Sequence, residues 1–446
     1  MPGMLTSLAV RAARRLPGPV RQALRRSRGV ILRSVRRRPV AASVAPPEAV
    51  PLPPRPAPPT APVRLLIGPA NFGGQGWEWG RAVERELDRV GVQVFMFTRE
   101  DGFDYPHDYG VPAAVYRSAA WGLQQEDYVP RHFTHVLIEA VRPVLGFARG
   151  ADVAVEVSRL RAAGLAVAMV AHGSDVRLPS GHASRYPYSP FTDPDWDLAV
   201  RLEEQAERLG AIIRGHDGPT FVSTPDLLDD VPRATWLPVV LDLARWSAGS
   251  VPLERERPLV VHAPSHTRLK GTELIEPIVE GLAEKGLLDY RRIAGVANAD
   301  MPAVFAEADV VLDQFVLGSY GVAACEGLAA GRVVLGHVAD PVRRRVVEAV
   351  GADVPILEAT VDTLGQVLER VCEERSWAQE RAAAGVDFVR QVHDGRHSAR
   401  VLAPFLLGRP PTPSCSSTVG DGQRAGEPGG GGCAGGGGAA PGTAGG

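Results

Sequence analysis

Cysteine is scarce in this chain of 446 residues, and the four cysteines show no CxxC or Cys/His arrangement with the spacing of a zinc site. Cys325 and Cys372 fall in segments that we expect to be helical, whereas Cys415 and Cys433 fall in a glycine-rich tail. We therefore predict reduced thiols in a cytoplasmic protein. We predict no metal site.

Long apolar runs are also missing. No segment approaches the ~20 apolar residues that a membrane-spanning helix needs. The sequence has no P-loop, no Ser/His/Asp triad, no paired carboxylates at glycosidase spacing and no cluster of metal ligands. We expect a cytoplasmic or peripheral protein rather than an integral one, and no nucleic-acid partner.

Acidic residues are absent from residues 1–40, which contain eleven arginines. Removing these eleven charges from the formal net charge of −2 leaves −13 on the rest of the chain. Three interpretations of this arm remain open: an amphipathic helix on the inner face of an anionic membrane, a disordered polybasic tail, or translated sequence upstream of the true start codon. It lacks the uninterrupted apolar core of a secretory signal.

Both ends of the chain have a composition that does not favour a packed core. Nine prolines between Pro46 and Pro62 predict a stiff, extended spacer that holds the arm away from the body. Residues from Arg409 onward are rich in Pro, Ser and then Gly, which predicts disorder. About 345 residues remain, enough for two domains with their own cores.

The body has the composition of a soluble globular protein, with 45% hydrophobic and 22% charged residues. Apolar runs alternate with helix-length amphipathic segments, which predicts parallel sheets covered by helices. In the first half we expect strands at 63–67, 92–97, 135–138, 167–170, 211–213 and 221–223, and helices at 151–163 and 195–209. In the second half we expect strands at 259–261, 290–294, 310–312 and 333–335, and helices at 272–285, 301–307, 361–384 and 386–406.

The segment 309–337 is the most informative part of the chain. An apolar strand is followed by Gly318 and Gly321, then by a helix that carries Glu326, and then by another apolar strand. Glycines allow a close backbone approach, and the free amides at a helix start favour a diphosphate. Glu326 could reach ligand hydroxyls, so a nucleotide is the economical hypothesis. The alternative is a solvated glutamate with glycines that act only as caps.

Three segments carry a resemblance to a known family. The first consists of Asp313, Gln314, Gly318, Tyr320, Gly321, Glu326, Gly327, Ala330 and Gly331. The second is residues 260–273 (VVHAPSHTRLKGTE), and the third is residues 171–178 (AHGSDVRL). They resemble GT-B glycosyltransferases, particularly the retaining family 4-like group. The first resembles the donor-binding segment, the second the first strand and loop of the nucleotide-binding domain, and the third the His-Gly segment that faces the cleft from the amino-terminal half.

The resemblance covers residues from about 63 to 405 and implies an α/β fold of two Rossmann-like domains that face a cleft. The expected organisation is a basic arm and Pro-rich linker, disordered or peripheral (1–62), an acceptor domain (63–245), a donor domain (246–390), a terminal helix that returns to the first domain (391–408), and a disordered tail (409–446).

The implied activity is transfer of a sugar from a nucleotide-diphosphate sugar to a glycan, a lipid-linked acceptor or a small molecule. Retention of configuration and independence of metals follow from the resemblance only, and no cofactor is expected besides the donor substrate. Two alternatives remain open: a sugar-nucleotide epimerase of the same fold, and a non-catalytic subunit that binds a nucleotide sugar.

Fixed positive charge would stabilise the departing diphosphate, and Lys270, just before a glycine, is the residue we expect to supply it. Arg268 or His266 would assist. By resemblance, His172 contacts the donor sugar from across the cleft, while Asp175 orients its loop, binds acceptor or caps a turn. The remaining expected contacts are Glu326, Gly318, Ser319, Tyr320 and Gly321 on the donor side, and Asn71, Gly73 and Gly74 on the acceptor side.

Two positions depart from the family pattern. Ser265 stands where an arginine usually precedes the lysine, and Arg268 is the expected substitute. Gly318 stands where many family members have a first glutamate, so amides of residues 319–321 would bind the sugar hydroxyls instead.

Overall fold

The computed structural model describes residues 51–99, 102, 104–193, 196–246 and 250–408. The arginine-rich arm, the first prolines of the spacer, the C-terminal tail, Cys415 and Cys433 lie outside these residues. Among the described residues, no helix is long and apolar enough to cross a membrane.

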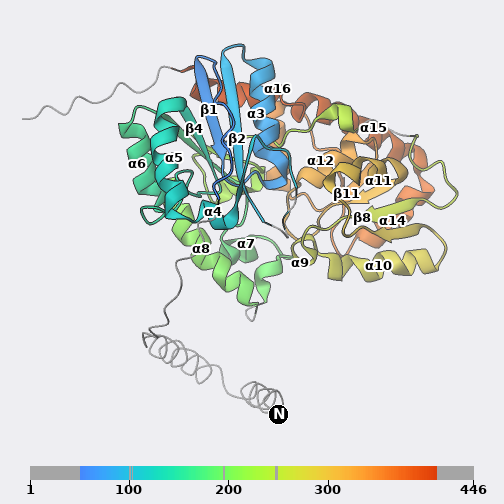
Figure 1. The fold of residues 1–446 in the computed structure, drawn as a ribbon. Coiled ribbons are helices and arrows are strands. Elements are labelled where there is room, and N and C mark those ends of the chain that lie inside the picture. Colours follow the sequence, from blue (N-terminus) through green and yellow to red (C-terminus); the bar gives the residue numbers. More distant parts are fainter. Residues whose placement is uncertain (1–50, 100–101, 103, 194–195, 247–249, 409–446) are drawn as a thin grey trace, which may run out of the picture. The chain divides into compact units, whose positions relative to one another are not determined.

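The first half of the body folds around a seven-stranded parallel sheet with the strand order β3-β2-β1-β4-β5-β6-β7. Figure 1 labels β1, β2 and β4 of this sheet. The core strands are apolar because helices cover them, as is usual for parallel sheets. The strands are β1 (Val63–Gly68), β2 (Val90–Thr98), β3 (Tyr109–Pro112), β4 (His135–Glu139), β5 (Ala166–Ala171), β6 (Thr220–Val222) and β7 (Thr235–Trp236). The accompanying helices are α3 (Gln75–Glu86), α4 (Ala113–Tyr116), α5 (Ala119–His132), α6 (Val153–Ala162), α7 (Pro179–Arg185) and α8 (Asp197–Arg214).

The strand predicted at 211–213 is wrong, because these residues form the last turn of α8. Leu209, Gly210 and Ile213 continue the buried stripe of this helix at helical spacing. The short apolar run therefore belongs to a helix face, which periodicity alone could not distinguish from a buried strand.

The second half folds around a five-stranded parallel sheet with the order β12-β11-β10-β8-β9. Its strands are β8 (Leu259–His262), β9 (Asp289–Arg292), β10 (Val310–Leu312), β11 (Val333–Gly336) and β12 (Leu357–Glu358). Its helices are α9 (Thr267–Lys270), α10 (Thr272–Glu284), α11 (Met301–Glu307), α12 (Val322–Ala329), α13 (Asp340–Val350), α14 (Leu364–Glu373) and α15 (Arg375–Val392). The predicted α/β class with two Rossmann-like parallel sheets is confirmed.

The boundaries predicted for the C-terminal helices are wrong. The chain forms α14, α15 and a final helix α16 (Arg396–Leu407), with breaks at Glu374 and at Asp394-Gly395. The expected break near residue 385 is absent because Gly385 lies inside α15, where an added Cβ would lie 2.7 Å from Leu328. This glycine allows close helix packing rather than a turn.

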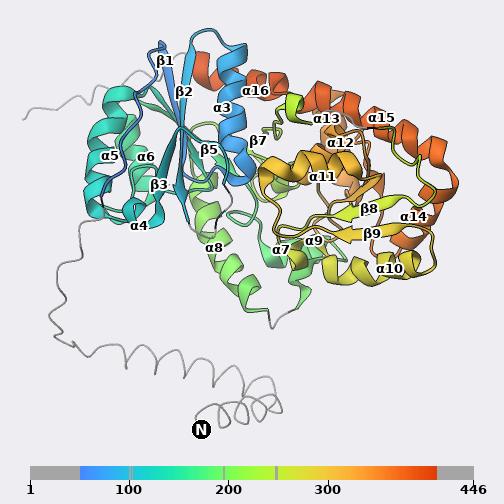
Figure 2. The same cartoon turned by 45° about the vertical axis from the view of Figure 1, so that its right-hand side comes forward.

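Helix α16 packs against α3 and β1 of the first sheet (Figures 1 and 2). Its buried face, which includes Leu402 and Leu406, joins the core cluster that contains Leu65, Ile67 and Trp79. The last helix therefore completes the core of the first sheet, although it follows the second sheet in sequence.

Residues 53–60 of the Pro-rich segment form neither helix nor strand and contact elements of the first sheet. Arg55 lies over the rings of Tyr109 and Tyr128, and its Nη1 donates a hydrogen bond to Gln125. Residues 53–62 are therefore part of the body rather than a free spacer.

In each sheet the strand order reverses once. The reversal lies between β1 and β4 in the first sheet and between β8 and β10 in the second. Parallel α/β sheets bind ligands outside the carboxyl ends of the strands at such switch points. The loops after these four strands are thus where a site is expected.

Candidate functional site

A cavity of about 630 Å³ lies between loops of the two sheets. The loop after β1 contributes Phe72 and Gly73. The loop after β8, the 3₁₀ helix η5 (Asn298–Asp300) and the start of α12 contribute Ser265, Lys270, Asn298 and Glu326, among others. Three residues predicted from the sequence, Gly73, Lys270 and Glu326, therefore line one cavity.

Lys270 is the last residue of α9 and forms an ion pair with Asp313, which follows β10. Its Nζ lies 2.5 Å from Oδ1 of Asp313, and the aspartate is almost fully buried. The ion pair directs the ammonium group toward the switch point. It also neutralises part of the charge of Lys270.

Glu326 lies on α12 with 8% of its surface exposed. Burial raises the pKa of its carboxyl to about 7, against the opposing effects of Arg245 and then Lys270. Burial and the charge of Glu326 likewise raise the pKa of Tyr105, another cavity residue, to about 12. A carboxyl group that changes charge near neutral pH therefore lies at the cavity wall.

The amino-terminal end of α12 faces this cavity. Val322 and Ala323, its first two residues, line the cavity, and Gly321 precedes the helix with open space where a Cβ would be. The loop after β1 approaches closely, since a Cβ on Gly73 would lie 3.1 Å from Val322. The first amides of α12 and the helix dipole favour an anion at this end.

The residues just before Gly321 serve packing. Gly318 has φ of +67°, and an added Cβ would lie 2.6 Å from the ring of Tyr186. Ser319 is buried, and its carbonyl accepts a hydrogen bond from Gln314. Tyr320 packs against Phe388 and His393. The structure thus places these predicted donor contacts outside the cavity lining, and position 318 has no room for a glutamate.

His172 follows β5 and lies behind Phe72 rather than in the cavity lining. Its ring stacks on that of Trp79, with 5.6 Å between the ring centroids, and makes an edge-on contact with that of Phe72, with 5.5 Å between the centroids. The backbone amides of His172 and Gly173 donate hydrogen bonds to the carboxylate of Asp175. Of the roles considered for Asp175, the structure shows that it orients this loop.

Arg268 and His266 lie on another side of α9, toward Trp196. The guanidinium group of Arg268 lies 4.2 Å from the Trp196 ring centroid and forms an ion pair of 3.0 Å with Asp193. His266 caps α9, and its ring centroid is 6.3 Å from that of Trp196. Neither residue lines the cavity, and neither does Gly74, which contacts Tyr105.

The sequence analysis missed Glu139, a fully buried carboxylate at the end of β4. One of its oxygens accepts hydrogen bonds from the amides of Ala70 and Asn71, and the other lies 3.4 Å from Nε2 of His172. It holds together the loops after β1, β4 and β5. In the sequence, the sign that could have identified Glu139 is its position directly after a predicted apolar strand.

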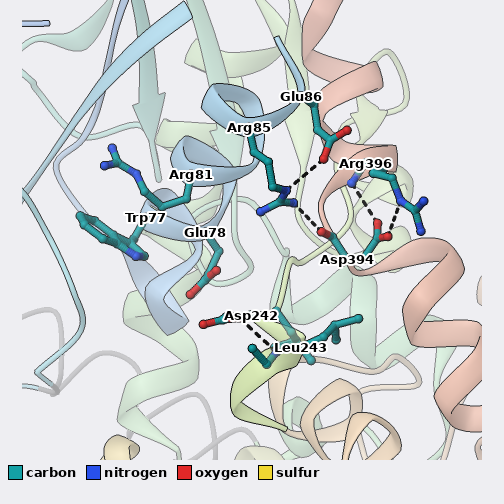
Figure 3. A pocket seen from close by; sticks show the side chains of 11 residues that line it. Trp77, Glu78, Arg81, Arg85, Glu86, Asp242, Leu243, Asp394 and Arg396 are labelled. Carbon is teal, nitrogen blue, oxygen red and sulfur yellow. Dashed lines mark hydrogen bonds and ion pairs between the residues drawn. The ribbon is translucent and has the colours of Figure 1, made fainter. Parts of the chain in front are cut away.

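A second cavity, of about 450 Å³, lies where the chain crosses between the two sheets (Figure 3). Glu78 of α3 points toward Asp242 of the linker, and Arg85 of α3 donates a hydrogen bond of 2.7 Å to the carbonyl of Asp394. Burial, together with Asp242, raises the pKa of Glu78 to about 7. The residues predicted to bind donor or acceptor are not among those lining this cavity.

Two Rossmann-like parallel sheets with a cavity between their switch-point loops define the GT-B fold class, and the predicted resemblance holds at the level of the fold. The structure of sucrose-phosphate synthase from Thermosynechococcus elongatus is similar, with 13% identity, a TM-score of 0.51 and coverage of 76% of this chain and 96% of that one.

Two further similar structures have TM-scores below 0.5. WaaG, a glycosyltransferase involved in lipopolysaccharide biosynthesis, has 15% identity and a TM-score of 0.46, and the match covers 77% of this chain and 100% of that one. Anabaena HepE in complex with UDP-glucose has 11% identity and a TM-score of 0.48, and the match covers 77% of this chain and 98% of that one. The chain matches no protein-family model, and no curated protein sequence is detectably similar to it.

Proposed function

We propose that this protein is a glycosyltransferase that takes a sugar from a nucleotide-diphosphate sugar and transfers it to a glycan, a lipid-linked acceptor or a small molecule. The observation that carries the proposal is the cavity of about 630 Å³ that combines Lys270, Glu326 and the start of α12. A cation and free helix amides suit a diphosphate, and a carboxylate suits the hydroxyls of a sugar or ribose.

In this proposal the diphosphate lies against the first amides of α12 and Lys270. Both are positioned before the reaction, Lys270 by Asp313 and the amides by the helix, so they stabilise charge that develops on the leaving group without reorganisation. Glu326 in its ionised form accepts hydrogen bonds from ligand hydroxyls. The reaction needs no metal or other cofactor in this proposal, and the configuration of the transferred sugar is retained.

The acceptor enters from the side of the loop after β1, where Phe72 and Gly73 line the cavity. Phe72 lines the cavity and its ring contacts that of His172, so in this proposal His172 contacts the donor sugar once Phe72 moves aside. Asp175 and Glu139 hold the loops on which these residues lie. The protein acts in the cytoplasm, and the arm at residues 1–40 is the part proposed to contact the inner face of the membrane.

A non-catalytic subunit that binds a nucleotide sugar is the second candidate. Two observations favour it: Gly318 leaves no room for an acidic side chain, and Arg268 is engaged by Trp196 and Asp193. Such a subunit would bind donor and turn over nothing. An epimerase would isomerise the donor without an acceptor.

The test is a thermal-shift panel of the full-length chain with UDP, GDP, ADP and TDP and their common sugars. A ligand that binds only the folded state raises Tm in a concentration-dependent way. We expect one nucleotide to do so, and Glu326→Ala and Lys270→Ala to abolish the shift. Lys285→Ala, which removes an exposed lysine after α10, is the matched control.

Turnover then separates the three functions. A transferase releases the nucleoside diphosphate and forms a glycosylated acceptor, an epimerase forms a new nucleotide sugar, and a binding subunit forms no product. No Tm shift with any of the nucleotides would contradict all three.

A further inference from the structure

The cavity of about 630 Å³ that we propose binds the donor has too little positive charge for a diphosphate. The charged side chains among the described lining residues are Lys270 and Glu326. Lys270 is already paired with Asp313. The diphosphate of a nucleotide sugar carries two negative charges, and it would lie beside Glu326 with one partly neutralised cation. A second positive charge is needed near this wall.

Arg268, the substitute expected from the sequence, is poorly placed for this purpose. It lies over the ring of Trp196 and is paired with Asp193, so recruiting it to the cavity would break both contacts. Ser265 does line the cavity but carries no charge.

Arg245 is better placed. It ends the short 3₁₀ helix η4 (Leu243–Arg245) in the linker between the sheets. Its Nη2 lies 3.3 Å from the carbonyl oxygen and 3.4 Å from the side-chain oxygen of Asn298, which lines the cavity. Asn298 therefore lies between the guanidinium group and the cavity.

The guanidinium group of Arg245 also has capacity to bind an anion. Among the described residues Arg245 forms no ion pair with a carboxylate, and its hydrogen-bond acceptors are the two neutral oxygens of Asn298. A guanidinium has five N–H donors, so most remain available. The positive charge of Arg245 also lowers the pKa of Glu326, more than that of Lys270 does, against the raising effect of burial.

We propose that Arg245 is a donor-binding residue that completes the cation pair around the diphosphate with Lys270. The inference rests on the proposed function, because it assigns a contact in the same cavity. The residue comes from the linker between the sheets rather than from the nucleotide-binding loops. A bound diphosphate would therefore tie the linker to the second sheet through Arg245.

The test compares the affinity of full-length Arg245→Gln, Arg245→Lys and wild type for UDP, GDP, ADP and TDP and for the matching nucleosides, by isothermal titration calorimetry. For the diphosphate that binds wild type, we expect Arg245→Gln to weaken affinity by about tenfold or more. Affinity for the nucleoside should change less than about twofold, because the base and ribose do not use the guanidinium. Arg245→Lys should recover part of the loss.

Arg257→Gln is the matched control, since Arg257 pairs with Asp289 at the start of β9 and does not line the cavity. Equal diphosphate affinity of Arg245→Gln and wild type would overturn this inference while leaving the proposed function intact. Equal losses for the diphosphate and the nucleoside would also overturn it, since they would indicate a structural role of the linker. Failure of wild type to bind any of the diphosphates would overturn both.

Discussion

At the scale of single residues, Glu326 is a cavity residue whose charge responds to pH near neutrality. Its carboxyl is buried at the cavity wall, and its pKa is raised to about 7 by burial. Ligand hydroxyls donate hydrogen bonds to the ionised form and so favour ionisation. The affinity for a nucleotide sugar should consequently depend on pH near neutrality.

We predict that this affinity rises about tenfold between pH 6 and pH 8 and then levels off, because the ionised fraction rises through a pKa of about 7. Calorimetric titration at several pH values measures it. In Glu326→Gln the affinity should be lower and independent of pH. The same pH dependence in wild type and Glu326→Gln would assign the titration to another group.

Gly318 is the clearest case of a glycine required by the backbone and by a neighbour. An alanine there needs a left-handed φ of +67° and places its Cβ 2.6 Å from the Tyr186 ring. We expect Gly318→Ala to lower the free energy of unfolding by about 1–3 kcal/mol in urea titrations.

Gly281→Ala is the matched control for this substitution. Gly281 lies inside α10, has no positive φ, and nothing lies within 4 Å of an added Cβ. Gly281→Ala should leave the free energy of unfolding unchanged or raise it by about 0.5–1 kcal/mol. Equal effects at the two positions would contradict the role assigned to Gly318.

At the scale of elements, α16 joins the core of the first sheet although it is the last helix of the described chain. Leu402 is fully buried in that core, whereas Leu407 at the end of the same helix is 53% exposed. We predict that Leu402→Ala costs about 2–5 kcal/mol of unfolding free energy and that Leu407→Ala costs less than about 0.5 kcal/mol. Urea denaturation gives both values, and similar costs would mean that α16 does not stabilise the body.

At the scale of the whole molecule, the second cavity joins α3, the linker and the turn between α15 and α16 (Figure 3). Burial and the nearby Asp242 raise the folded-state pKa of Glu78 to about 7, above the ordinary value of 4.5. The folded state thus holds this proton more tightly than the unfolded chain does. Ionisation of Glu78 destabilises the fold progressively as pH rises from about 4.5 to about 7.

We predict that Glu78→Gln, which cannot ionise, is more stable than wild type at pH 8 by about 1 kcal/mol, a value reduced for partial solvent exposure. The difference should shrink as the pH falls and approach zero below about pH 4.5, where Glu78 becomes protonated in both states. Urea titrations of both proteins at pH 5 and pH 8 measure it. A difference that is independent of pH would contradict the raised pKa.

The sequence by itself determined the features that depend on short-range patterns. Apolar runs and turn glycines predicted the parallel α/β class, and the resemblance to GT-B glycosyltransferases selected Lys270 beside Glu326. The alternation of strands and helices depends on residues close together in the chain, so local periodicity is sufficient to predict it.

Only the tertiary structure decided which residues face the cavity. Tyr320 packs against Phe388 and His393, Gly318 lies against Tyr186, and Arg268 lies over Trp196, and none of the three lines the cavity. Arg245 of the linker contacts Asn298, which lines the cavity. Each of these placements depends on contacts between segments far apart in sequence. Packing selects such contacts through shape and charge, and no local pattern encodes them.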